Sequence, residues 1–134
     1  MNYFLAKTEP NTYSIDDLSK KGQDTWEGVN NYTAINNLKA MKKGDQVLIY
    51  HSGKDSAIVG LAEVTKEAIP DPKNPKSWVP IVKFIKKFDQ TVSLKEIKDT
   101  KKFDDWMLIR QGRLSVMPVP EKFISWLKDK GVSL

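Results

Sequence analysis

Short apolar runs separated by polar segments mark the elements of this chain. Five runs have the length and the β-branched or aromatic content of strands, at residues 2–7, 46–51, 57–66, 78–88 and 114–117. In residues 32–41 and 123–127 the apolar positions instead recur every three or four residues, as on one face of a helix. Strands and short helices without regular alternation predict an α+β fold, a small mixed barrel or curled sheet, and not a doubly wound parallel fold.

Capping and turn residues predict where several elements begin and end. Ser14 stands three residues before Asp17, and Ser93 three before Glu96, so both serines are predicted to start helices through a capping box. The last helix is predicted over residues 120–131, between a proline and a glycine.

Three other segments carry specific expectations. Residues 53–56 are expected to turn the chain between two strands of a hairpin. Residues 70–76 contain three prolines and are expected to form a solvated loop with no packing face. Gly60 and Ala62 interrupt an apolar strand with small residues, which predicts that a neighbour approaches the backbone closely there. The pattern of residues 106–110 fits no single element type.

Composition restricts the class of protein. The 134 residues, with 40% hydrophobic and 29% charged side chains, fit one soluble domain over residues 1–134. The absence of cysteine excludes disulfides and thiolate chemistry. Neither a basic leader nor an apolar run long enough to span a membrane is visible. We therefore expect a cytoplasmic monomer without a membrane partner.

Positive charge is concentrated in the second half of the chain. Residues 1–67 contain 8 Lys and Arg against 9 Asp and Glu, a net charge of −1, whereas residues 68–134 contain 14 against 8, a net charge of +6. This asymmetry is typical of a protein with one phosphate-facing side, although lysines also keep small domains soluble. Arg110 and Arg113 flank Gly112, a weak motif for holding a phosphate.

The chain lacks the residues for several kinds of chemistry. His51 is the only histidine, so a side-chain metal site or a Ser–His–Asp triad has little support, and we expect neither a metal nor a cofactor. No dinucleotide-binding or P-loop motif occurs. His51 is expected to form a hydrogen bond at a strand end, in either a structural or a ligand-facing role.

The segment Trp26-Glu27-Gly28-Val29-Asn30-Asn31-Tyr32 is more polar than ordinary core, and Tyr50-His51-Ser52 follows about twenty residues later. Aromatic plates beside amides and hydroxyls suit a flat, polar, ring-shaped ligand, of which a nucleobase is the commonest. The alternative is that Trp26 is a core residue, and the residues alone leave both readings open.

A series of motifs resembles the EVE domain, a family of the PUA-like superfamily. The motifs are Lys7-Thr8-Glu9-Pro10, Tyr13-Ser14-Ile15-Asp16-Asp17-Leu18, the Trp26 segment, Asn36-Asn37-Leu38-Lys39-Ala40-Met41-Lys42, Tyr50-His51-Ser52, Ile58-Val59-Gly60, Pro70-Asp71-Pro72 and Arg113-Leu114-Ser115-Val116-Met117-Pro118-Val119. They run in order from about residue 2 to residue 128. One departure is at Asn30-Asn31, because the family is expected to have a basic or variable residue between Val29 and the Asn-Tyr pair.

This resemblance implies a PUA-like fold, a curled mixed β-barrel surrounded by short helices. It also implies a non-catalytic nucleic-acid-binding module that recognises a flipped or single-stranded modified base, such as methylated or hydroxymethylated cytosine in DNA or a modified base in RNA. The base pocket would comprise Trp26, Val29, Asn30, Tyr32, Tyr50, His51, Ser52, Leu114, Ser115 and Val116. Phosphates would contact Lys7, Thr8, Arg110 and Arg113.

An enzyme is the alternative from another class. Some PUA-like relatives of the ASCH type resemble small amidohydrolases or ribonucleases. Lys7, Glu9 and Tyr50 are the residues that acid–base chemistry on modified nucleosides or RNA would use here.

Overall fold

A six-stranded mixed sheet forms the centre of the computed structural model, which describes residues 1–134. The strands are β1 (Tyr3–Thr8), β2 (Gln23–Thr25), β3 (Gln46–His51), β4 (Ala57–Asp71), β5 (Asn74–Ser93) and β6 (Val116–Pro118). The helices are α1 (Ile15–Lys21), α2 (Tyr32–Ala40), α3 (Leu94–Asp99), α4 (Met107–Arg110) and α5 (Glu121–Asp129). None of the helices is both long and apolar enough to cross a membrane.

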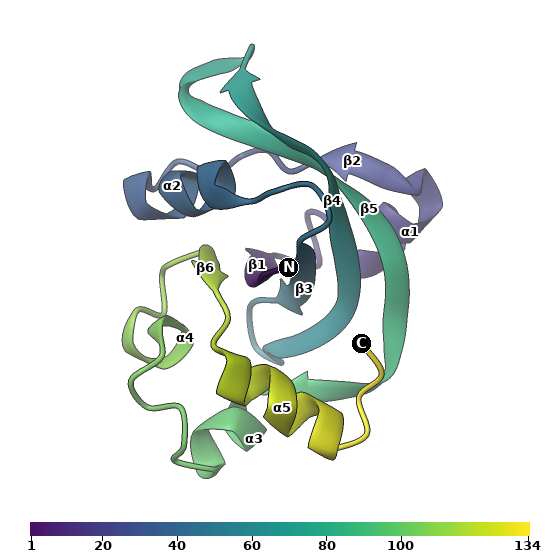
Figure 1. Cartoon of the computed structure of the whole chain (residues 1–134), viewed down its shortest axis with the longest axis vertical. Helices are drawn as coiled ribbons and strands as arrows, with labels where there is room; N and C mark the ends of the chain where they lie inside the picture. The colour runs from purple at the N-terminus through teal and green to yellow at the C-terminus, as the bar shows by residue number, and fades with distance from the viewer.

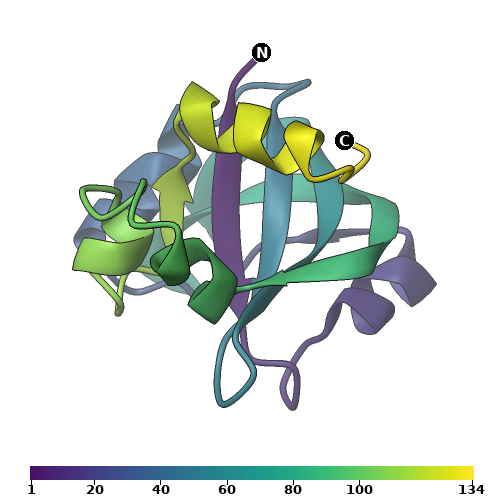
Figure 2. The same cartoon turned by 90° about the horizontal axis from the view of Figure 1, so that it is seen from below.

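The strand order is β2-β5-β4-β3-β1-β6, with β1 and β3 parallel and every other pair antiparallel. The long strands β4 and β5 curve around β1 and β3, so that the sheet is strongly curled (Figures 1 and 2). Strand β2 lies at one end of this sheet and β6 at the other. The predicted α+β class, with a curled mixed sheet and short helices, is confirmed.

The inner face of the sheet and the apolar faces of the helices form one core. Leu5, Leu48 and Leu61 from three strands are completely or almost completely buried, as is Leu38 from α2. A second part of the core is aromatic, since Phe103, Trp106, Phe123 and Trp126 pack edge-to-face or tilted with ring centroids 4.6–6.5 Å apart. These rings hold α5 against the segment before α4, and Trp106 Nε1 donates to the carbonyl of Pro118 in β6 at 3.0 Å.

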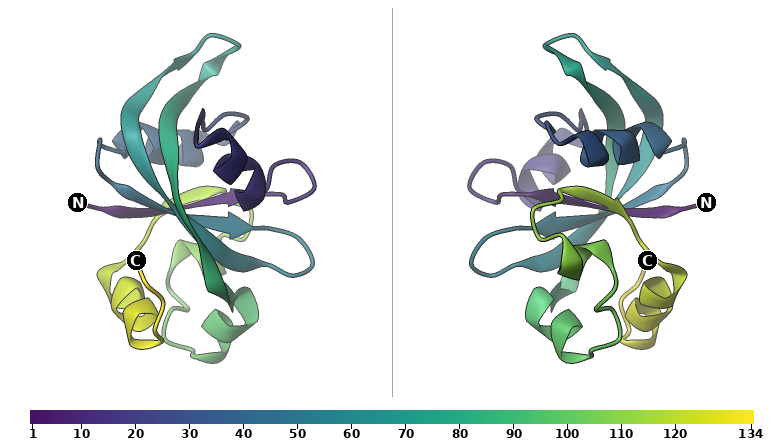
Figure 3. Two further views of the ribbon diagram at one scale, coloured as in Figure 1. Left: turned by 90° about the vertical axis from the view of Figure 1, so that its right-hand side faces the viewer. Right: turned by 90° about the vertical axis from the view of Figure 1, so that its left-hand side faces the viewer.

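Beyond the sheet, β4 and β5 continue as a twisted two-stranded arm, visible at the top of Figure 3. The prediction of a solvated loop at 70–76 is therefore wrong, because only residues 72–73 separate the two strands. Prolines are tolerated here because neither strand of the arm has a second neighbour that would need their missing N–H groups. The arm also has a packing face, on which Ser77 and Val79 are buried.

Other element ends differ less from prediction. Strand β2 was not predicted, since its three residues carry no apolar alternation. Residues 106–110 contain the short helix α4. Strand β6 begins two residues later than expected, because Leu114 donates its N–H to the carbonyl of Gln111 in a turn.

Two contacts fix α1 against the sheet. The Nε2 atom of His51 accepts a hydrogen bond from the N–H of Ile15 at 3.0 Å, so His51 holds the start of the helix. The Ile15 side chain lies on the backbone of Gly60, where a Cβ atom would come within 2.7 Å of Ile15 Cδ1. The predicted close approach at Gly60 is thus confirmed. Both predicted capping boxes, at Ser14 and Ser93, are present as well.

Candidate functional site

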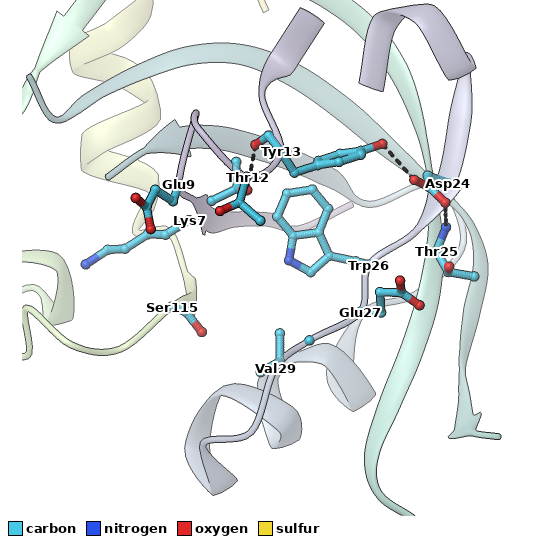
Figure 4. A pocket seen from close by; sticks show the side chains of 12 residues that line it. Lys7, Glu9, Thr12, Tyr13, Asp24, Thr25, Trp26, Glu27, Val29 and Ser115 are labelled. Carbon is cyan, nitrogen blue, oxygen red and sulfur yellow. Dashed lines mark hydrogen bonds between the residues drawn. The ribbon is translucent and has the colours of Figure 1, made fainter. Parts of the chain in front are cut away.

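A cavity of about 570 Å³ lies between the two ends of the curled sheet. Its lining comprises residues 7–9, 12–13, 24–29 and Ser115. One wall is β2 and the segment that follows it, and the other is the end of β1 with the residue just before β6 (Figure 4). The cavity therefore exists because β2 and β6, the end strands of the sheet, are not neighbours in it.

Trp26 forms part of the cavity wall, although its side chain is only 7% exposed. Its indole packs edge-to-face against the ring of Tyr13, with centroids 6.4 Å apart and an interplanar angle of 88°. Figure 4 shows the indole nitrogen on the side of the open space, toward Ser115 and Val29. Trp26 thus meets the cavity through a narrow part of the ring and not through a full face.

A hydrogen-bond network holds the Tyr13 ring against Trp26. The Tyr13 hydroxyl donates to Asp24 Oδ2 at 2.7 Å, and the same oxygen accepts from Lys21 Nζ at 3.2 Å. Burial and the bond to Asp24 raise the pKa of Tyr13. Burial opposes the charged form of Asp24, but the hydrogen bonds from Tyr13 and Lys21 together hold the pKa of its carboxyl below the usual value. Asp24 is therefore charged, and its carboxylate is engaged in hydrogen bonds with Tyr13 and Lys21.

The segment after Trp26 is fixed by the arm of β4 and β5. Ser77 donates its hydroxyl to the carbonyl oxygen of Val29 at 2.8 Å in a buried position, and Asn74 donates its amide to Asn30 Oδ1 at 3.0 Å. The Asn31 side chain caps α2 by accepting from the N–H of Ala34 at 3.0 Å. Both asparagines after Val29 thus have structural partners.

Lys7 connects the cavity to the loop that carries the two arginines. Its ammonium group donates to the carbonyl oxygen of Gly112 at 2.9 Å and lies 5.4 Å from the ring centroid of Tyr50. The side chain is half-buried, and burial lowers the pKa of Lys7. Arg110 and Arg113 are exposed on either side of Gly112.

Negative charge outnumbers positive charge on the cavity wall itself. Lys7 is the one cation there, against Glu9, Asp24 and Glu27. Asp24 is paired with Lys21, whereas the carboxylates of Glu9 and Glu27 have no protein hydrogen-bond or ion-pair partner. No group of three His, Cys, Asp or Glu side chains is arranged to hold a metal. The excess of lysine and arginine therefore lies outside the cavity.

Some of the residues predicted for ligand contact come together at the cavity, and others do not. Those on its wall are Lys7, Thr8, Trp26, Val29 and Ser115. The buried ones away from it are Tyr50, Leu114 and Val116. Those at the surface outside it are Asn30, Tyr32, Arg110 and Arg113. His51 is occupied by Ile15, and Ser52 bonds to the carbonyl of Thr8 through its N–H and its hydroxyl at 3.0 and 3.4 Å.

The positions of Tyr50 and Tyr32 have simple physical reasons. Tyr50 is 2% exposed, since its strand, β3, lies between β1 and β4 and the Lys7 ammonium lies over its ring. Tyr32 is 79% exposed because the cap formed by Asn31 ends the cavity segment and turns the chain into α2. The acid–base group of Lys7, Glu9 and Tyr50 is therefore incomplete at the cavity, where only the first two are present.

The sequence prediction missed Thr12, Tyr13, Asp24 and Thr25 on the cavity wall. These residues come from the loop before α1 and from the short strand β2, neither of which carries a recognisable ligand motif. Tyr13 belongs to one of the motifs that resemble the EVE domain, and the signal for Asp24 and Thr25 was a polar stretch on the N-terminal side of Trp26. Their approach to Lys7 and Ser115 depends on the curl of the whole sheet.

Comparisons with known proteins identify the family. The EVE domain model matches residues 2–129. Thymocyte nuclear protein 1 of Gallus gallus is 33% identical, over 90% of this chain and 64% of that protein, so the chain spans somewhat less than two thirds of this relative. A hypothetical protein from Leishmania major is 36% identical, with a TM-score of 0.85 over 98% of this chain and 96% of that one.

A further solved structure is human THYN1 in complex with 5-methylcytosine-containing DNA. It is 27% identical and has a TM-score of 0.86, with 95% of each chain covered. The predicted resemblance is thus confirmed by both sequence and structure. This chain belongs to the EVE domain family.

Proposed function

We propose that this chain binds nucleic acid that carries a modified base, such as 5-methylcytosine, and that the modified base enters the cavity beside Trp26. The observation that carries the proposal is the cavity itself. Its volume of about 570 Å³ lies within the usual range for small-ligand sites of roughly 300–1,000 Å³, and its lining includes an indole, hydroxyls and one valine beside four charged side chains. The likeness to human THYN1 in complex with 5-methylcytosine-containing DNA supports this class of partner.

The charges on and around the cavity suggest how a nucleotide is oriented. With one cation against three carboxylates, the wall disfavours a phosphate and accepts a neutral ring. Phosphates are better placed over the exposed loop with Arg110 and Arg113, which Lys7 ties to the cavity mouth through Gly112. The base then points inward while the backbone stays outside.

Energetics favour a base that is already unstacked. Extrusion of a base from duplex DNA costs a few kcal/mol, and one buried methyl group, for example against Val29, contributes only about 0.8 kcal/mol. The methyl group alone would give about fourfold preference. We therefore expect tighter binding to single-stranded than to duplex DNA, with much of the affinity supplied by phosphate contacts.

The test uses a labelled single-stranded oligonucleotide with 5-methylcytosine, cytosine or an abasic site at one central position. Fluorescence anisotropy should give the order 5-methylcytosine, then cytosine, then abasic. Equal affinity for the methylated and abasic strands would refute entry of the base into the cavity.

A salt series tests the phosphate contacts. Substitution Arg113→Gln should weaken binding to all three oligonucleotides alike and reduce the slope of log K against log salt by about 0.7 to 1. Lys128→Gln, which removes an exposed cation on α5 away from the cavity, is the matched control and should leave the slope nearly unchanged. Equal slopes of log K against log salt for wild type and Arg113→Gln would show that this loop is not part of the DNA interface.

An enzymatic function is a second candidate because Lys7 and Glu9 both line the cavity and burial lowers the pKa of Lys7. A lysine with a lowered pKa is a better proton acceptor near neutral pH. Incubation with modified nucleosides and RNA, followed by chromatography, tests this function. Turnover that Lys7→Met abolishes would support it, and unchanged substrates would exclude it for those compounds.

A further inference from the structure

Two tryptophans of this chain are almost equally buried but differ at their indole N–H groups. Trp106 is 6% exposed, and its Nε1 donates to the carbonyl oxygen of Pro118 at 3.0 Å. Trp26 is 7% exposed, and its Nε1 donates to no protein acceptor. No side-chain nitrogen or oxygen atom is both sealed from solvent and without a partner, so the Trp26 Nε1 atom keeps some contact with solvent. The Trp26 N–H therefore opens into the cavity, as Figure 4 shows.

The exposed area of Trp26 is too small for a stacked base. A tryptophan side chain has roughly 250 Å² of surface, so an exposed fraction of 7% leaves about 20 Å². Stacking of a base needs most of one indole face, which is several times the area exposed here. The polar group of Trp26 that has no protein partner and lies on the side of the cavity is its indole N–H.

We propose that Trp26 reads the bound base as a hydrogen-bond donor, through Nε1–H, and not as a stacking plate. This inference rests on the proposed function and names the chemistry of the same site. The ligand is a heterocycle that presents an in-plane acceptor, a carbonyl oxygen or an unprotonated ring nitrogen, toward the indole edge. An indole N–H can only donate, so a base with a donor at that point leaves two N–H groups opposed.

The surroundings of Trp26 suit this role. Tyr13, held by Asp24, packs against the indole and fixes its orientation, so the N–H direction is set before a ligand arrives. The side chains of Thr12 and Ser115 also line the cavity, and their hydroxyls have no protein partner. Each hydroxyl can rotate either to donate or to accept a hydrogen bond, whereas the indole N–H can only donate. The indole is therefore the group that requires an acceptor on the ligand.

The decisive experiment replaces the N–H group without changing the ring. Incorporation of 3-benzothienylalanine at position 26 puts sulfur in place of Nε1–H and keeps the bicyclic shape. Affinity for the single-stranded oligonucleotide with 5-methylcytosine should fall about tenfold, since a desolvated acceptor of the ligand loses its donor. The same replacement at position 106 is the matched control and should lower stability while leaving the affinity unchanged.

The outcomes separate this inference from the proposed function. If the position 26 analogue binds like wild type while Trp26→Ala binds weakly, the indole acts through its ring, and the donor role is refuted with the cavity site intact. If 5-methylcytosine and abasic strands bind equally to wild type, the proposed function itself fails. Because the analogue keeps the shape of tryptophan, a folding defect in Trp26→Ala does not obscure the result.

An NMR measurement gives a second readout. The four tryptophans give four indole N–H signals, which single Trp→Phe variants assign. In the free protein the Trp26 N–H should exchange with water faster than that of Trp106. Addition of the 5-methylcytosine oligonucleotide should slow this exchange and shift the Trp26 signal downfield. An unchanged Trp26 signal at saturation would overturn the donor role.

Discussion

Gly60 offers the sharpest test of how the sheet positions the cavity. In Gly60→Ala the new Cβ would lie 2.8 Å from the carbonyl oxygen of Lys86, and 2.7 and 2.9 Å from Cδ1 and Cγ1 of Ile15. The Ile15 side chain can move aside in part, but the Lys86 carbonyl belongs to the neighbouring strand β5 and cannot move without disturbing the ladder. The substitution therefore strains the sheet and pushes against α1.

The magnitude follows from overpacking, which typically costs about 1–3 kcal/mol. A chain of 134 residues has an unfolding entropy of about 0.28 kcal/mol/K, so the melting temperature should fall by about 4–11 °C. Displacement of Ile15 also moves the start of α1 and the preceding loop, whose residues Thr12 and Tyr13 line the cavity. Binding of the 5-methylcytosine oligonucleotide should weaken along with stability.

Thermal and urea unfolding followed by circular dichroism measure the effect. Gly112→Ala is the control, because nothing lies within 4 Å of the added Cβ and its backbone φ is not positive, so its stability should match or slightly exceed wild type. The second substitution Ile15→Val removes Cδ1 and should recover only part of the loss, since the Lys86 contact remains. A Gly60→Ala protein as stable as wild type would refute the close packing of Ile15 and the Lys86 carbonyl against Gly60.

Two further predictions concern groups that support the cavity. Burial lowers the pKa of His51, which must stay neutral to accept from Ile15, so the unfolded chain binds more protons below pH ~6.5. The stability that His51 contributes should be complete above that pH and decline as the pH falls from there toward its folded pKa. Urea titrations from pH 5 to 8 should show this dependence of the unfolding free energy on pH in wild type and not in His51→Gln. If the variant keeps the dependence, it arises from another titrating group. Ser77→Ala should cost about 1–3 kcal/mol by leaving the buried Val29 carbonyl unpaired, and a neutral result in chemical denaturation would contradict that bond.

Local signals were sufficient for much of the fold. The serine caps at positions 14 and 93, the apolar faces of α2 and α5, and the strands β1, β3 and the first part of β4 all follow from periodicity and from side chains that bond to nearby backbone. The prediction failed where pairing overrode composition. The proline-rich segment forms paired strands, because β4 and β5 lie side by side across a tight turn and each backbone supplies hydrogen-bond partners for the other.

The residues of the candidate site were likewise predicted only in part. Trp26, Val29 and Ser115 were named from motifs and do lie on the cavity wall, whereas Tyr50 from an equally suggestive motif lies in the core. Alternation along a strand gives two possible faces, and only the neighbouring elements decide which one is covered. Asn30 was likewise predicted to lie in the base pocket, but it is exposed outside the cavity and accepts a hydrogen bond from Asn74.

By itself, the sequence determined the family, the α+β class and the segment that carries the key indole, because these depend on short-range patterns and on the order of motifs. Only the tertiary structure decided which part of that indole meets solvent. The curl of the sheet brings β1, β2 and the residue before β6 around one cavity, and the indole, packed edge-to-face with Tyr13, turns its nitrogen toward the open space. Such long-range approach depends on how strands pair and bend, which no local stretch of residues encodes.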